Sequence, residues 1–175
     1  MTWHPHLGRN VPDYGLAKAK AEEVLKDNSF SQPPVLPKEI AANYGITVLF
    51  ADFGQEHKEV SGFYDGKSRS IYVNGDDNPR RQTFTIAHEL GHFLLHGNLF
   101  RDHPEDYRVL LRYPIGAAKE PLEQEANCFA ANLLVPRSFL DKYYRIASVQ
   151  ELARLFIVSG DVIRFRLQHE YAVDA

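Results

Sequence analysis

Apolar residues recur three and four positions apart along several segments of this chain, which is the spacing of one face of an α-helix. The first such segment runs from Leu16 to Lys26. The second runs from Pro37 to Asn43, where Pro37 suits a first helical position and Gly45 can end the helix. Further helices are predicted at residues 79–96, 121–135, 136–144, 149–156 and 160–170.

Between the second and third helices the pattern changes to short β-branched and aromatic runs, which predict strands at residues 46–50, 61–64 and 70–73. Asp65-Gly66 lies between the last two runs and is typical of a hairpin turn. We therefore predict an α+β fold, in which a small, mostly antiparallel sheet packs against a helical core. The sheet leads directly into the helix from Pro79 to His96, with Gly97 as its stop. Residues 98–119 lack periodicity and predict a long loop.

Composition narrows the class of protein. At 175 residues, 44% of them hydrophobic and 25% charged, the chain fits one domain, or one domain with a small appendage. Its formal net charge of -3 gives no global attraction to nucleic acid or to an anionic membrane. No segment approaches the ~20 apolar residues of a membrane span, and the N-terminus lacks a signal-peptide pattern, so we expect a cytoplasmic protein.

The single cysteine, Cys128, excludes an internal disulfide and a thiolate cluster. A metal site in this chain must therefore be built from His, Asp and Glu. One segment of the third predicted helix, His88-Glu89-Leu90-Gly91-His92, has the H-E-x-x-H pattern. Residues four apart lie on one helical face, about 6 Å along the axis, so His88 and His92 can bind the same ion.

Glu89 lies about 100° round the helix from His88, where it suits a general base that contacts a metal-bound water rather than a third ligand. Gly91 is unfavourable in a helix interior by about 1 kcal/mol relative to Ala, which predicts a closely packed neighbour.

A catalytic zinc site needs a third protein ligand, and the acidic cluster at the start of the next helix can supply it. Glu123 is the preferred ligand, because Asn127 lies four residues later on the same face and can orient one of the histidines. Glu120 and Glu125 stay as alternatives, although Glu125 points to a different face and is expected in solvent. Manganese or iron also suits such donors, so one zinc ion is the first choice among several divalent metals.

Other polar residues are assigned supporting roles. His96 continues the face of His88 and His92 but lies two turns from His88, which predicts a packing or orienting role rather than metal binding. The developing oxyanion of a peptidase reaction usually needs a second donor, and Tyr72, Arg81 and His103 are the candidates.

Several blocks of the sequence, in the order in which they occur along the chain, resemble the ImmA/IrrE family of metallopeptidases. The resemblance covers about Leu16 to Leu167. The resemblance is carried by Pro37-Lys38-Glu39-Ile40-Ala41, Tyr44-Gly45-Ile46-Thr47-Val48, Ser61-Gly62-Phe63-Tyr64, Ile71-Tyr72-Val73-Asn74, Arg81 to His96, and Glu123 to Pro136. It implies a zincin-like helical core with zinc bound by His88, His92 and a Glu of the last block, and with Glu89 as catalytic base.

The same resemblance implies the partner. Family members cleave helix-turn-helix (XRE-type) transcriptional repressors and so regulate phage, mobile-element, toxin–antitoxin or stress genes. The chain then divides into a metallopeptidase domain at residues 1–144 and a helix-turn-helix-like segment at residues 145–175. Direct DNA binding by that segment is not expected, because the chain is acidic and the segment carries few cations. The alternative is a zinc-stabilised regulatory module that binds a repressor or toxin without cutting it.

Overall fold

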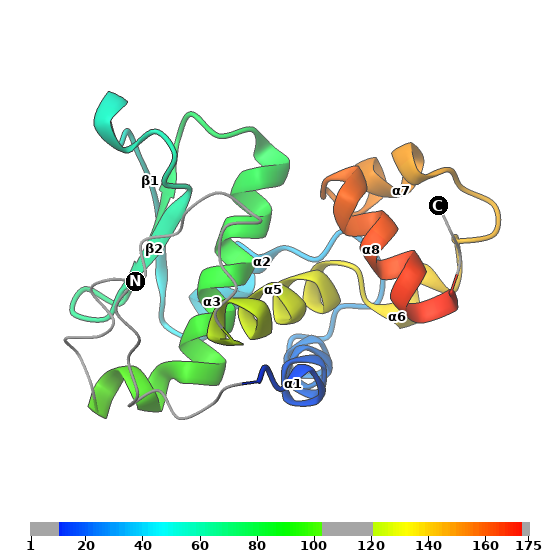
Figure 1. The fold of residues 1–175 in the computed structure, drawn as a ribbon, viewed down its shortest axis with the longest axis horizontal. Coiled ribbons are helices and arrows are strands. Elements are labelled where there is room, and N and C mark those ends of the chain that lie inside the picture. The colour runs from blue at the N-terminus through cyan, green and yellow to red at the C-terminus, as the bar shows by residue number, and fades with distance from the viewer. Residues whose placement is uncertain (1–10, 103–120, 173–175) are drawn as a thin grey trace.

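A computed structural model describes residues 11–102 and 121–172 of the protein. It confirms the α+β class: helices dominate and one small sheet is present (Figure 1). The elements, in chain order, are α1 (Tyr14–Asp27), α2 (Pro37–Asn43), β1 (Thr47–Ala51), the 3-10 turn η2 (Gln55–His57), β2 (Gly62–Asp65), β3 (Ser70–Asn74), α3 (Pro79–Asp102), α5 (Pro121–Leu134), α6 (Arg137–Leu140), α7 (Val149–Leu155) and α8 (Gly160–Tyr171).

The sheet has three strands in the order β1-β3-β2. β2 and β3 form the predicted antiparallel hairpin, in which the Asp65 side chain accepts hydrogen bonds from the Lys67 amide at 3.0 Å and the Ser68 hydroxyl at 2.7 Å. β1 pairs with β3 in parallel, so the sheet is mixed. On the central strand Ile71 and Val73 are fully buried, and α3 packs against the face that carries them. This arrangement follows from the period-2 alternation of a strand with one covered face.

α3 is the centre of the molecule. The sheet lies on one side of it, α5 crosses it, and α1 packs against α5 (Figure 1). A single apolar core joins these elements and continues into the C-terminal helices. The two helices that carry the candidate site, α3 and α5, are therefore held in place from several directions.

Two helix boundaries differ from the predictions. α3 does not stop at Gly97 but continues to Asp102, so residues 98–102 of the predicted loop are helical. A glycine in a helix is unfavourable by only about 1 kcal/mol, which a favourable helix on both sides can outweigh. The predicted helix at 136–144 is shorter: α6 ends at Leu140 and turns follow. The rest of the predicted loop, residues 103–119, lies outside the described residues.

α7 and α8 form a pair at the end of the molecule opposite the sheet (Figure 1). Each begins at a serine cap: Ser148 and Glu151 form a capping box, and the Ser159 hydroxyl accepts a hydrogen bond from the Val162 amide. The division of the chain at residues 144 and 145 stays a prediction. Within the described ranges no helix combines the length and the apolar character needed to cross a membrane.

Candidate metal centre

His88 and His92 lie on consecutive turns of α3, with side chains that are 0% and 3% exposed. Their rings meet edge to face with centroids 4.7 Å apart. Their Nε2 atoms are 3.0 Å from each other. The helical spacing of four residues therefore brings the two imidazoles to one point, as the motif predicts.

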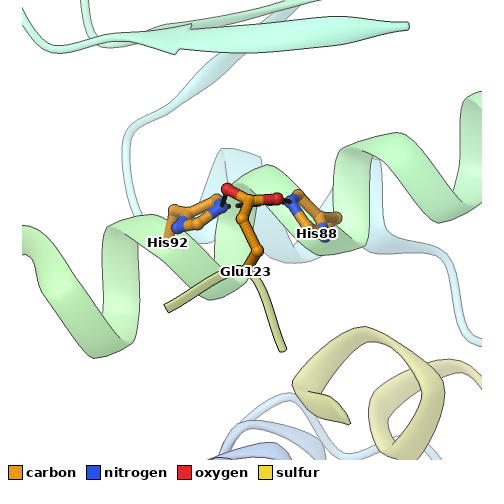
Figure 2. A group of neighbouring side chains, drawn as sticks. All are labelled: His88, His92 and Glu123. Atoms are coloured by element: carbon orange, nitrogen blue, oxygen red, sulfur yellow. Dashed lines mark hydrogen bonds and ion pairs between the residues drawn. The ribbon is translucent and has the colours of Figure 1, made fainter. Parts of the chain in front are cut away.

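Glu123, near the start of α5, places its carboxylate at the same point (Figure 2). One of its oxygens is 3.2 Å from His88 Nε2 and the other is 2.9 Å from His92 Nε2. Burial alone would raise the pKa of Glu123, but the imidazoles of His92 and His88 outweigh it and hold that pKa below its ordinary value. Each of these three residues offers one ligand atom, and these atoms all lie within 4.8 Å of one another.

The way these atoms face one another fits a bound cation. In a neutral imidazole one nitrogen carries a proton and the other a lone pair. His88 donates its Nδ1 proton to Asn127 Oδ1 at 2.9 Å, which leaves the lone pair on Nε2, directed toward His92 Nε2 and the Glu123 carboxylate. Acceptors that converge in a dry site repel one another unless a proton or a cation lies between them. Two imidazoles and one carboxylate are also the donor set that divalent zinc, manganese and iron share.

Asn127 lies one turn after Glu123 on α5. The sequence predicts that its amide orients a metal-binding histidine, and its contact with His88 is present in the structure. One face of α5 thus supplies both a candidate ligand and the acceptor that sets the tautomer of another ligand.

His96 is not part of the ligand group and lies directly behind it. Its Nδ1 is 3.1 Å from His92 Nδ1, and its Nε2 is 2.9 Å from Glu125 Oε2. Burial and the neighbouring charge of His92 lower the pKa of His96 to about 4, although Glu125 acts in the opposite direction. His96 is therefore neutral at physiological pH.

The prediction that Glu125 lies in solvent is wrong. Its side chain is 2% exposed and accepts one hydrogen bond from the Asp13 amide at 2.7 Å in addition to its contact with His96. α5 packs against α1 as well as α3, so both sides of the helix are covered. A signal was present in the sequence, because apolar residues on all sides of a helix predict that it has no solvent face. The apolar residues of α5 are Leu122, Ala126, Phe129, Ala130, Ala131, Leu133 and Leu134.

Gly91 lies at a close approach between α3 and α5. A Cβ at this position would be 2.9 Å from Phe129 Cδ1 and 3.4 Å from the Ala126 Cα. The predicted packing reason for a glycine inside the motif is confirmed, because any side chain here would push α5 away from the histidines.

The other residues that the sequence predicts for the site do not all lie beside the ligand group. Glu89 is buried beside the ligands on α3, with an exposed fraction of 3%. Arg81 lies at the start of α3, where its Nε donates to Ser61 Oγ at 2.7 Å and to Asp77 Oδ2 at 3.0 Å. Tyr72 lies on the sheet face away from α3 and stacks on Phe63, so the structure does not bring it to the ligand group. His103 and Glu120 lie outside the described residues.

A cavity of about 1300 Å³ lies between the start of α3, α5 and α8. Asn127 lines it, but His88, His92 and Glu123 do not. Among the described residues the cavity therefore reaches Asn127 but not the converging ligand atoms, and its size alone does not mark it as the reactive site.

Comparison with known proteins adds the family context. Residues 41–168 match the family model of the IrrE N-terminal-like domain, a peptidase family. Immunity region protein 2 of Bacillus phage phi105 is 30% identical over 137 residues, which are 77% of this chain and 78% of that protein. Metallopeptidase ImmA of Bacillus subtilis is 27% identical over 153 residues, 86% of this chain and 83% of that protein.

The radiation response metalloprotease IrrE of Deinococcus deserti is 34% identical over 99 residues. These residues are 55% of this chain but only 32% of that protein, so the chain corresponds to about a third of this relative. Among solved structures, a Mycobacterium tuberculosis transcriptional regulator matches 87% of this chain and 46% of its own, with a TM-score of 0.62 and 20% identity. At that identity the similarity concerns the fold alone.

Proposed function

Because this chain belongs to the IrrE N-terminal-like (ImmA/IrrE) family of metallopeptidases, we propose that it is a zinc-dependent endopeptidase that cleaves a helix-turn-helix transcriptional repressor. The observation that carries the proposal is the convergence of His88, His92 and Glu123 in a buried site. The motif residue Glu89 follows the first of these on the same helix.

In this proposal His88, His92 and Glu123 hold one divalent ion. Bound zinc would lower the pKa of a water molecule toward neutrality and polarise the peptide carbonyl. Asn127 keeps His88 in the tautomer whose Nε2 carries the lone pair, through the 2.9 Å contact of the Asn127 Oδ1 with Nδ1. Manganese and iron prefer overlapping donors, so metal analysis of the protein as purified from its source identifies the ion in use.

Glu89 acts as the general base. It accepts a proton from the attacking water and passes it to the leaving amine when the peptide bond breaks. Glu89 is buried and directly follows His88 on α3, which places it beside the proposed metal site. Of the candidates for oxyanion donor, Arg81 lies on α3 itself and Tyr72 lies on the opposite sheet face.

The substrate class is supported by the relatives. One carries the name of a phage immunity region protein and another is a metallopeptidase of the same length class as this chain. The name of the phage relative links that protein to an immunity region, which supports a regulatory protein as the substrate of this chain. In this proposal the chain is a regulatory peptidase rather than a digestive one.

The test combines the purified protein with a candidate helix-turn-helix repressor from its source organism, with and without a chelator. We expect cleavage that the chelator abolishes and added zinc restores. Glu89→Gln should bind zinc normally and cleave about 10²–10⁴ times more slowly. If Glu89→Gln keeps both its zinc and the full cleavage rate, the assigned mechanism is wrong. An intact repressor that co-purifies with the wild-type protein would favour the non-cleaving binding module instead.

A further inference from the structure

We propose that Glu125 and His96 act together as positioning residues for His92, by fixing which of its ring nitrogens carries the proton. This inference rests on the proposed metal site and deepens it. It assigns a function to the carboxylate that the motif does not contain and to the third histidine of α3. Both side chains are buried, at 2% exposure each, so their polar atoms depend on protein partners.

The three residues form one continuous hydrogen-bonded chain. Glu125 Oε2 is 2.9 Å from His96 Nε2, and His96 Nδ1 is 3.1 Å from His92 Nδ1. The chain ends at His92 Nε2, which faces Glu123 at 2.9 Å. Every ring nitrogen of His96 and His92 therefore has a defined neighbour.

The positions of the protons follow from these contacts. To bind a cation, His92 must present a lone pair on Nε2, so its proton is on Nδ1 and is donated to His96 Nδ1. His96 Nδ1 must then be an acceptor, and the proton of His96 must be on Nε2. A carboxylate oxygen accepts hydrogen bonds, and Glu125 accepts one from this N–H group of His96. The metal-binding tautomer of His92 is thus selected by Glu125 through His96.

Glu125 is itself anchored. Its second oxygen, Oε1, accepts the backbone amide of Asp13 at 2.7 Å, at the start of α1. Asp13 also caps α1 through its side chain, which accepts the Leu16 amide at 2.8 Å. The carboxylate therefore has both oxygens engaged by donors, which holds it in one orientation and ties the support of His92 to α1.

The two candidate ligands on α3 are supported by different chemistry. His88 donates directly to the neutral amide oxygen of Asn127 at 2.9 Å, whereas His92 reaches the carboxylate of Glu125 through two hydrogen bonds, with His96 between them. An amide side chain can rotate to present either its oxygen or its nitrogen, but a carboxylate presents only acceptors. Replacing Glu125 should therefore affect His92 in a way that is predictable from the proton positions.

Three variants separate positioning from packing. His96→Gln keeps an acceptor for His92 and a donor for Glu125, whereas His96→Leu fills similar space and removes both. Glu125→Gln keeps the shape, but its single oxygen is needed by the Asp13 amide. Its NH₂ group then faces His96 Nε2 and favours the proton on Nδ1, opposite the Nδ1 proton of His92. A role limited to packing predicts no difference between His96→Gln and His96→Leu.

The experiment measures zinc affinity of each metal-free protein by competition with a chromophoric chelator. It also determines the tautomer of His96 in the zinc-loaded wild type by ¹⁵N NMR. We expect His96→Leu and Glu125→Gln to bind zinc about 10- to 100-fold more weakly, as loss of a supporting partner typically does. His96→Gln should stay within about threefold of the wild type, and His96 should carry its proton on Nε2.

Wild-type affinity in either His96→Leu or Glu125→Gln would overturn the proposal, and so would a His96→Gln protein as weak as His96→Leu. Unfolding curves of the metal-free variants show whether each has folded. A proton found on Nδ1 of His96 in the zinc-loaded wild type also overturns it, even where no variant folds. None of these measurements uses a repressor, so a failure to find cleavage would count against the proposed function and leave this result intact.

Discussion

Two buried polar clusters lie at opposite ends of α5, and they are built on opposite principles. The metal cluster consists of His88, His92 and Glu123. The Glu170 cluster consists of the carboxylate of Glu170 and the cations that contact it, namely Lys18 at 2.9 Å, Arg166 at 2.9 Å and Arg137 at 3.4 Å.

In the Glu170 cluster, donors face acceptors. Arg166 and Glu170 have side chains that are 2% and 4% exposed and neutralise each other, and Arg166 Nε also donates to the Val135 carbonyl at 3.0 Å. These contacts join α8 to the end of α5 and to α1. In the metal cluster, by contrast, acceptors face acceptors. The first arrangement pairs opposite charges within the protein and stabilises the fold, whereas the second has the donor set of the cation site that we propose.

The largest expected effect is the stabilisation of the folded protein by zinc. Zinc at a thousand times its dissociation constant should stabilise the wild type against unfolding by about 4 kcal/mol, because only the folded protein holds the three ligands together. Glu123→Gln should reduce that gain to below about 1 kcal/mol while its metal-free stability stays near that of the wild type. Denaturant unfolding with zinc or with a chelator measures both. A Glu123→Gln protein that still gains the full amount would remove Glu123 from the ligand set.

The reverse pattern is expected at Glu170. Glu170→Gln should destabilise the metal-free protein by about 3 kcal/mol, because it leaves the buried Arg166 charge without its partner, and should leave the zinc response unchanged. Glu23→Gln is the matched control, since Glu23 pairs with Lys20 at 2.8 Å but is 55% exposed, and exposed pairs contribute about 0–1 kcal/mol. Equal effects of the two substitutions would contradict a structural role for the Glu170 cluster.

The pH dependence of stability, compared between the wild type and Glu170→Gln, tests the same cluster in a second way. Burial alone would raise the pKa of Glu170, but the hydrogen bond from Lys18 and the charge of Arg166 outweigh it and lower that pKa below its ordinary value of 4.5. A lowered pKa contributes stability above the ordinary value, and this stability is lost as the pH falls through the folded value. The stability difference between wild type and Glu170→Gln should therefore be constant near neutrality and shrink below about pH 4.5. A difference that grows on acidification would have the wrong sign.

The smallest expected effect concerns the spacing of α3 and α5, on which only the metal cluster depends. Gly91→Ala gains about 1 kcal/mol in helix propensity but places a Cβ 2.9 Å from Phe129, and overpacking costs about 1–3 kcal/mol. We expect a net loss of about 1 kcal/mol together with weaker zinc binding. Gly97→Ala is the control in the same helix, since no described atom lies within 4 Å of its added Cβ, and it should be neutral or stabilising. Calorimetric melting measures the stability of both variants, and zinc titration measures their affinity for zinc.

The features of the site that the sequence predicts are those set within one helix. His88 and His92 converge because they are four residues apart. A glycine inside the helix indicated a close neighbour, but only the structure identifies that neighbour as Phe129 of α5. The hairpin at Asp65-Gly66 and the cap at Ser159 are likewise decided by neighbouring residues. The end of α3 was not predictable in this way, because Gly97 permits a stop without requiring one.

Contacts between helices depended on the tertiary structure. Glu123 and Glu125 are two residues apart and chemically identical, yet one faces the histidine pair and the other lies behind it, against His96 and the start of α1. The sequence by itself determined that two histidines and a glutamate would lie along one turn of a helix. Only the packing of α5 between α3 and α1 decided which carboxylate meets which histidine, because local spacing orders residues along a helix but does not specify the rotation of one helix against another.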